Sequence, residues 1–149
     1  MMEWVPPPRG CLKLNFDGSS KGNPGPAGFG GIITGDEGQI IMVYSGPMGT
    51  TTSNEAEVTG LLEGVKMLST LSTSPLAIEG DSKLTIGWAR KAINIPWKIK
   101  HIIDELSEIT KDWNITWNSI PRSANHVADH LAKGVNRSAI TIGNSIPLS

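Results

Sequence analysis

The order in which two kinds of hydrophobic pattern follow one another is the strongest constraint on the fold. Residues 11–17, CLKLNFD, alternate apolar and polar side chains as a half-buried strand does. Leu12, Leu14 and Phe16 would face the core, and Lys13, Asn15 and Asp17 the other side. Residues 27–46 contain two more apolar runs around the turn sequence Asp36-Glu37-Gly38, and predict a hairpin. The chain therefore opens with three consecutive strands, which we expect to be antiparallel.

The remainder of the chain alternates between helical and strand-like patterns. Apolar residues recur at helical spacing in four segments, and Ser53 or Asn54 can cap the first. Gly60 and Gly64 would let that first helix lie close to the sheet. Helices are expected at residues 51–71, 82–92, 97–113 and 124–138, and two further strands at residues 75–82 and 114–120. The inward residues would be Val58, Leu61, Leu62 and Val65, then Ile99, Ile102, Ile103 and Leu106, and in the last helix Val127, Leu131 and Val135.

Three antiparallel strands, followed by strands that return through helical crossovers, define a mixed sheet. We therefore expect an α/β domain with a mixed five-stranded sheet flanked by helices. A chain of 149 residues has room for one core of this kind. Its parts would be a proline-rich lead-in at residues 1–10, the domain at residues 11–138, and a C-terminal tail at residues 139–149 that has no clear periodicity.

Charge and composition narrow the functional classes only partly. The formal net charge is −1 and the basic residues are scattered, so charge alone gives no argument for nucleic-acid binding. One basic cluster within residues 90–101 is of a kind that usually forms a solvated helix face. No apolar run approaches the roughly 20 residues that span a bilayer. The single cysteine, Cys11, forms no internal disulfide. These features predict a nuclear or cytoplasmic protein that does not enter membranes.

Four acidic residues occupy positions where α/β domains place their sites. Asp17 and Asp81 end predicted strands, and Glu57 and Asp129 lie in the first turns of predicted helices. Taken singly, such residues more often cap a helix, shape a turn or complement a helix dipole. Drawn together in a partly buried cleft, like charges are unfavourable unless a cation binds between them. Carboxylate oxygens favour Mg²⁺ or Mn²⁺, and a pair of such ions can promote phosphodiester hydrolysis.

Four motifs in this order are similar to those of a known family. They are FDGSSKGNPGPAGFGGII, TTSNEAEV, GDSKL and PRSANHVADHLAKG. With them the chain resembles the ribonuclease H family, type 1, from about Leu12 to Lys133. The resemblance implies the ribonuclease H-like fold and an endonuclease that hydrolyses the RNA strand of RNA/DNA hybrids. It also implies two Mg²⁺ ions, replaceable by Mn²⁺ and bridged by Asp17, with a site made of Asp17, Glu57, Asp81, Asp129 and Gly18.

The same resemblance assigns residues to the substrate. The glycine-rich loop after the first strand would approach the 2′-hydroxyls of the RNA through its backbone, because bulky side chains are absent there. Its residues are Gly18, Ser19, Gly22, Asn23 and Gly25. Thr52 and Asn54 would contact the DNA strand, although Asn54 is equally suited to capping the helix. Trp88 lies where the family grips the DNA strand and is equally suited to the core, and Arg122 stands near the last helix.

Histidines near the last helix leave alternatives open. Some members of the family carry a histidine in a loop before that helix, but residues 119–125, SIPRSAN, contain none. His126 is one candidate to replace it. His126 and His130, four residues apart beside Asp129, also suit a zinc site, although surface histidines are the commoner interpretation.

Partners and rival functions complete the expectations. Residues 91–98 are too short for the basic protrusion of some family members, so hybrid binding is expected to be weak or to need a partner domain. Residues 4–25 resemble plant domains that are often attached to retroelement reverse transcriptases, which makes a reverse-transcriptase domain in a longer parent chain an expected partner. The domain itself is expected to be monomeric. The rival functions are an inactive nucleic-acid-binding or scaffold module, and another nuclease of the superfold such as an exonuclease or integrase core.

Overall fold

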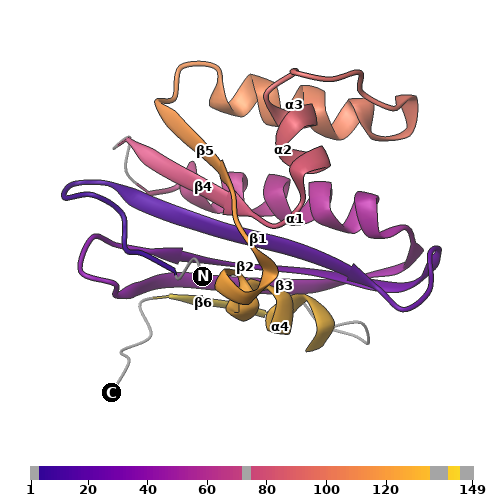
Figure 1. Cartoon of the computed structure of the whole chain (residues 1–149), viewed down its shortest axis with the longest axis horizontal. Helices are drawn as coiled ribbons and strands as arrows, with labels where there is room; N and C mark the ends of the chain where they lie inside the picture. The colour runs from indigo at the N-terminus through magenta and orange to yellow at the C-terminus, as the bar shows by residue number, and fades with distance from the viewer. Residues whose placement is uncertain (1–3, 72–74, 135–140, 145–149) are drawn as a thin grey trace.

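The computed structural model describes residues 4–71, 75–134 and 141–144, which form one mixed sheet with helices on both faces (Figure 1). The strand order is β5-β4-β1-β2-β3-β6. The strands are β1 (Leu12–Ser20), β2 (Gly25–Thr34), β3 (Ile40–Thr51), β4 (Leu76–Gly80), β5 (Ile115–Ser119) and β6 (Thr141–Asn144). The helices are α1 (Ser53–Leu68), α2 (Lys83–Ala89), α3 (Lys100–Thr110) and α4 (His126–Gly134), with short 3₁₀ turns η1 (Trp97–Ile99) and η2 (Arg122–Ala124).

The pairing confirms the mixed five-stranded sheet. β1, β2 and β3 form an antiparallel meander, and β4 and β5 add in parallel on the other side of β1. The structure adds a sixth strand, because β6 pairs antiparallel with β3 at the opposite edge. This strand lies in the segment that we expected to be a tail. Its four residues, TIGN, are too few to show a period-2 pattern.

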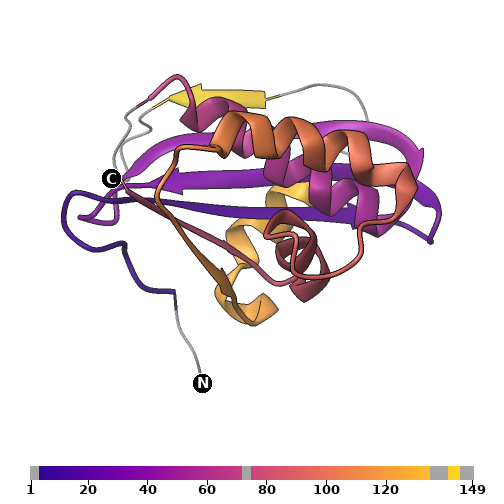
Figure 2. The same cartoon turned by 90° about the horizontal axis from the view of Figure 1, so that it is seen from above.

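The two faces of the sheet are covered by different helices. α1 packs on β1 and β2, and α3 packs on α1 (Figure 2). α4 lies on the opposite face, also against β1 and β2 (Figure 1). The expectation that β1 is half-buried is therefore wrong. Its polar side chains face α4 instead of water, and all three are buried: Lys13, Asn15 and Asp17. Among the described helices, none has the length and apolarity that crossing a membrane requires.

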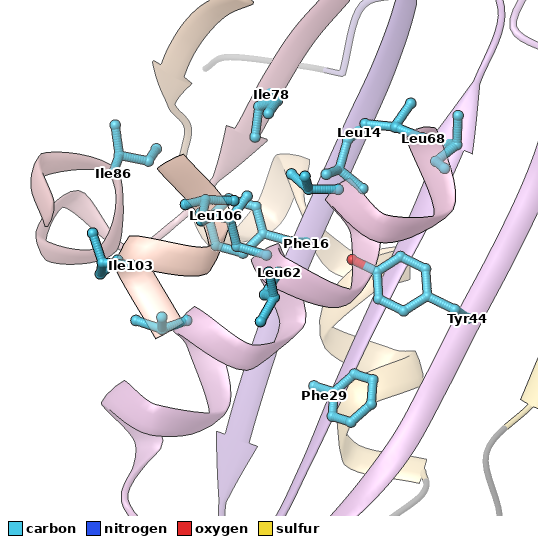
Figure 3. Close-up of a cluster of buried hydrophobic side chains, with 14 of the residues drawn as sticks. Leu14, Phe16, Phe29, Tyr44, Leu62, Leu68, Ile78, Ile86, Ile103 and Leu106 are labelled. Carbon is cyan, nitrogen blue, oxygen red and sulfur yellow. The ribbon is translucent and has the colours of Figure 1, made fainter. Parts of the chain in front are cut away.

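The main core lies between the sheet and the helices α1 and α3 that cover one of its faces (Figure 3). Leu14 and Phe16 from β1 meet Ile78 from β4, Leu62 from α1 and Leu106 from α3. These are the apolar positions that the alternating and helical patterns predict. The interior of the domain is thus organised around β1 and β2, which the helices on both faces contact.

The packing of α1 depends on its glycines. A Cβ at Gly60 would lie 2.5 Å from the carbonyl oxygen of Asp17, and a Cβ at Gly64 would lie 2.4 Å from the hydroxyl of Tyr44. That hydroxyl donates a hydrogen bond to the carbonyl of Gly60 at 2.5 Å. The expected close approach of this helix to the sheet is confirmed.

The inward face of α4 differs from the expected one. Val127 is 42% exposed, whereas Ala128 and Ala132 are buried against the sheet. The expectation for Val127 is wrong because α4 presents its small side chains to the sheet, which allows close packing over the polar face of β1. The side chains of Leu131 and Val135 lie outside what the structure describes.

Replacing Gly64 with alanine tests the close packing of α1. In an exposed helix this change stabilises by about 0.5–1 kcal/mol. Here the new methyl would overlap Tyr44 and Leu14, so we expect the free energy of unfolding to fall by about 1–3 kcal/mol. Urea denaturation measures the change, and Thr59→Ala on a less buried side of the same helix is the control. A stabilised Gly64→Ala protein would contradict the packing.

Candidate active site

Three of the four predicted acids meet at one place in the structure. Asp17 lies in β1, Glu57 in the first turns of α1, and Asp81 directly after β4. One carboxylate oxygen from each lies within 4.8 Å of the others. The parallel register of β1 and β4 pairs Asn15 with Glu79, so two residues further on Asp17 and Asp81 reach the same level. Strand pairing thus brings together residues that are far apart in sequence.

Asp17 is held more firmly than its predicted position implied. We expected it at the end of a strand, but β1 continues through Ser20 and pairs with β2 on its far side. Backbone pairing with β2 therefore fixes β1 both before and after Asp17. The side chain is 1% exposed, and its Oδ1 accepts a hydrogen bond from the backbone N–H of Gly18 at 2.9 Å.

Gly18 has a packing role that the sequence did not reveal. A Cβ at this residue would lie 2.1 Å from the carbonyl carbon of Ala56 and 2.2 Å from the nitrogen of Glu57. These atoms belong to the backbone of α1, so they cannot move aside as the end of a flexible side chain could. Only glycine therefore lets the first turn of α1 bring Glu57 beside Asp17. The implied role of Gly18 in binding metal stays a prediction.

Each of the three carboxylates has one oxygen that no described residue satisfies with a hydrogen bond, although Arg122 forms an ion pair with Asp81. Asp17 Oδ2, Glu57 Oε2 and Asp81 Oδ2 are buried oxygens with no hydrogen-bond partner among the described residues. Burial raises the pKa of Asp17, and the charge of Asp81 raises it further. Burial also raises the pKa of Glu57, with further contributions from its hydrogen bond to Asp17 and from that residue's charge. Burial raises the pKa of Asp81 as well. A cation would supply what these oxygens lack, and their chemistry suits a hard divalent ion.

Asp129 stands slightly apart from this group. It projects from the first turn of α4 and pairs with Lys133 at 3.1 Å. Burial pushes its pKa up, but hydrogen bonding with Asp17 and Lys133 outweighs that effect and lowers the pKa. Its interaction with Asp17 shows that α4 brings the fourth acid to the edge of the cluster, from the face of the sheet opposite α1.

A polar groove opens beside Asp81. Arg122, on η2, lies with its Nε 3.6 Å from Asp81 Oδ2, and most of its side chain is exposed. The other lining residues are Lys83, Ser119, Ile120 and Pro121. The sequence analysis named Arg122 as a candidate substrate contact, which stays a prediction, and did not consider Lys83. The only signal for Lys83 was its place in GDSKL, two residues after the third acid.

The glycine-rich segment is shorter than the expected loop. Gly18 and Ser19 belong to β1, Gly25 begins β2, and residues 21–24 alone form the turn. Gly22 has a φ of +95°, and a Cβ at Gly25 would lie 1.9 Å from the Lys21 carbonyl oxygen, so the turn itself requires both glycines. Asn23 Oδ1 accepts a hydrogen bond from the Ser53 N–H at 3.1 Å, which fixes this turn beside the start of α1.

The three other predicted DNA-strand contacts have different positions in the structure. Thr52, and neither Ser53 nor Asn54, is the N-cap of α1, because its hydroxyl accepts a hydrogen bond from the Glu55 N–H at 3.2 Å. Asn54 is exposed on the first helical turn and stays a candidate contact. Trp88 is 5% exposed and belongs to the core, the other of its two expected roles.

The structure gives no support to a zinc site at the histidines. His126 and His130 are exposed on α4. Within the part of the chain that the structure describes, the residues able to share one metal ion are three carboxylates, with no histidine among them. The acidic cluster is therefore the metal-binding candidate.

Comparison with known proteins identifies the family. The sequence model of a family described as reverse transcriptase-like matches residues 15–135. Ribonuclease HI of Halobacterium salinarum is 31% identical over 134 residues, which cover 86% of this chain and 66% of that protein. This chain belongs to the ribonuclease H family.

Other members of the ribonuclease H family show the same fold. The N-terminal RNase H domain of a Mycobacterium tuberculosis protein is 25% identical, with a TM-score of 0.81 over 85% of this chain and 99% of that chain. LC11-RNase H1, solved in complex with an RNA/DNA hybrid, is 27% identical, with a TM-score of 0.77 over 83% and 95%. A bifunctional protein of M. tuberculosis is 32% identical over 126 residues, 80% of this chain and 34% of that protein. The chain thus spans about a third of that relative's length.

Removing the charge of Asp17 is expected to stabilise the metal-free protein at neutral pH. Because the pKa of Asp17 is raised to about 7, the folded protein keeps a proton that the unfolded chain has already released. Its contribution to stability is therefore full below about pH 4, the unfolded value, and is lost as the pH rises through about 7.

Urea denaturation in EDTA measures this effect. At pH 7.5 we expect Asp17→Asn to raise the free energy of unfolding by about 1–3 kcal/mol, and at pH 4 we expect this gain to disappear. An Asp17→Asn protein less stable than the wild type at both pH values would show that the carboxylate is satisfied within the fold.

Proposed function

We propose that this domain is an endonuclease that hydrolyses the RNA strand of RNA/DNA hybrids with two bound Mg²⁺ ions, for which Mn²⁺ can substitute. Asp17, Glu57, Asp81 and Asp129 would hold the ions. The observation that carries the proposal is the group of three carboxylates, two of them on buried residues, each with a buried oxygen that has no hydrogen-bond partner among the described residues. Membership of the ribonuclease H family supports the reaction class.

The residues of the chain have distinct tasks in this proposal. When bound, such a pair of ions activates water and stabilises the leaving oxygen. Asp17 provides a ligand fixed within a strand, because β1 pairs with β2 from Lys13 to Ser20 and with β4 as far as Asn15. Glu57 is held against it through the close contact at Gly18. Asp81 has Arg122 as a cationic neighbour, and Asp129 has Lys133 and Arg122. These cations keep both acids more ionised than burial alone would.

The surroundings of the carboxylates suit a polyanionic substrate. Arg122 and Lys83 line the groove beside Asp81, where they would bind phosphates of the hybrid. The fixed turn at residues 21–24 and the start of α1 form one edge, with Ser19, Gly22, Asn23 and Gly25 toward the RNA strand and Thr52 and Asn54 toward the DNA strand. The complex of LC11-RNase H1 with an RNA/DNA hybrid supports this substrate class. Trp88 would act through the core, by supporting α2.

The setting of the domain is a further part of the proposal. The match to a reverse transcriptase-like family supports a parent chain that also carries a reverse transcriptase. We place the protein in the nucleus or cytoplasm, which the single free cysteine, Cys11, favours. The domain would act as a monomer.

A cleavage assay tests the function directly. The purified domain is incubated with a hybrid labelled internally in the RNA strand, with Mg²⁺, Mn²⁺ or EDTA. We expect metal-dependent internal cuts, reduced about 10³-fold or more in Asp17→Asn, as when a transition-state charge loses its stabilisation. Asp112→Asn, which changes an exposed acid beyond α3, is the control and should cut at the wild-type rate.

Each rival function predicts a different result in this assay. Binding of the hybrid without cleavage by a folded wild-type domain would favour the scaffold function. Cuts that start only at RNA or DNA ends, or on duplex DNA, would favour another nuclease of the superfold. Cleavage that survives both EDTA and Asp17→Asn would refute the metal-dependent mechanism.

Replacing Arg122 with alanine tests the groove. Because this guanidinium is largely exposed and forms a 3.6 Å ion pair with Asp81, its removal should leave the fold intact and weaken hybrid binding. We expect KM to rise about tenfold, and the slope of log K against log salt to become shallower by about 1. Lys111→Ala at the far end of α3 should change neither. An unchanged salt slope in Arg122→Ala would place the phosphates elsewhere.

A further inference from the structure

A pair of buried asparagines links α4 to the strand that carries Asp17. Asn15, in β1, and Asn125, between η2 and α4, are each 2% exposed. Asn15 Nδ2 donates to Asn125 Oδ1 at 3.1 Å. Asn125 Nδ2 in turn donates to the carbonyl oxygen of Phe16 at 2.9 Å. The second bond reaches the peptide unit immediately before Asp17.

The direction of every bond in this chain is fixed from outside the pair. Trp4 Nε1 donates to Asn15 Oδ1 at 3.0 Å, and an indole N–H can only donate. The Asn15 oxygen must therefore face Trp4, so its amide nitrogen must face Asn125. That nitrogen also lies 3.3 Å from Glu79 Oε1, an acceptor in a buried ion pair with Lys13. Asn125 is left to accept from Asn15 and to donate to Phe16, with no alternative orientation.

Asn125 also lies between the two elements that carry Arg122 and Asp129, which are η2 and α4. Arg122 precedes it by three residues on η2, and Asp129 follows it in the first turn of α4. The Asp129 N–H donates to the Asn125 carbonyl at 3.1 Å.

We infer that Asn125 is a positioning residue, which sets the separation between α4 with Asp129 and the β1 strand with Asp17, and thereby the affinity of the carboxylates for a divalent cation. Asn15 and Trp4 hold it in the one orientation that can do so. The inference rests on the proposed function, because it assumes that these carboxylates bind metal. It makes the lead-in residue Trp4 part of the support of the site.

The test is the Mg²⁺ concentration at which thermal stabilisation of the domain is half complete. Asn125→Ala removes both bonds of the side chain and should raise this midpoint about tenfold or more, as loss of the groups that orient metal ligands does. At saturating Mg²⁺ the kcat should return to within about threefold of the wild-type value, with KM for the hybrid unchanged. Leu68→Ala, at the far end of α1, should lower the melting temperature and leave the midpoint unchanged.

Trp4→Phe keeps the test valid if Asn125→Ala does not fold. Phenylalanine retains a ring near Lys13, whose Nζ lies 5.2 Å from the Trp4 ring centroid, but it cannot donate to Asn15. We expect its midpoint to rise by about threefold, a smaller effect because it acts one bond further away.

The outcomes separate the two proposals. A Mg²⁺ midpoint that stays at the wild-type value in Trp4→Phe, and in Asn125→Ala where that variant folds, would overturn the positioning role and leave the proposed function standing. A wild-type protein that Mg²⁺ does not stabilise would overturn the proposed function and this inference with it. A Mg²⁺ midpoint that rises in either variant, but stays at the wild-type value in Leu68→Ala, would support the positioning role.

Discussion

The burial of both faces of β1 is the constraint on which the rest of the structure depends. One face carries Leu14 and Phe16 into the main core. The other carries Lys13, Asn15 and Asp17 under α4, where each polar group needs a partner. Lys13 finds Glu79 at 3.0 Å, and Asn15 finds Trp4 and Asn125. Asp17 meets mainly other acids, so it is the one member of the series whose charge the protein leaves for something outside the chain to balance.

Close backbone packing is what brings the acids together against their repulsion. Gly18 faces the backbone of Ala56 and Glu57, and Gly60 faces the carbonyl of Asp17, so α1 contacts the β1 backbone at that acid and at the next residue. A Cβ at Gly18 would push the first turn of α1 away and increase the distance between Asp17 and Glu57. The charges would repel less, but the oxygens would no longer share a site. Packing at these glycines therefore holds an electrostatically unfavourable arrangement in place.

Much of the fold and most of the acidic site could be predicted from the sequence. Alternating and helical patterns are local, so they predict the order of strands and helices. That order places Asp17, Glu57 and Asp81 at or near the ends of elements. What failed depends on contacts between distant segments. The burial of Lys13 depends on its contacts with Trp4, Val5 and Glu79. The exposure of Val127 depends on how α4 lies on the sheet. Thr52, Ser53 and Asn54 are consecutive residues that can all cap, and only the structure shows that Thr52 does. Nothing local to Asn125 indicates that it contacts β1.

The unsatisfied carboxylates also distinguish a catalytic domain from a scaffold in energetic terms. A domain that only bound nucleic acid would be more stable with asparagine or an apolar residue in place of Asp17, since a buried charge without a partner is among the most unfavourable groups a fold can contain. Structural needs are met elsewhere on the same face, by the Lys13–Glu79 pair and the asparagine network. Each of these three acids has an oxygen without a hydrogen-bond partner among the described residues, and a bound divalent cation would make their burial, their closeness and their rigidity favourable together.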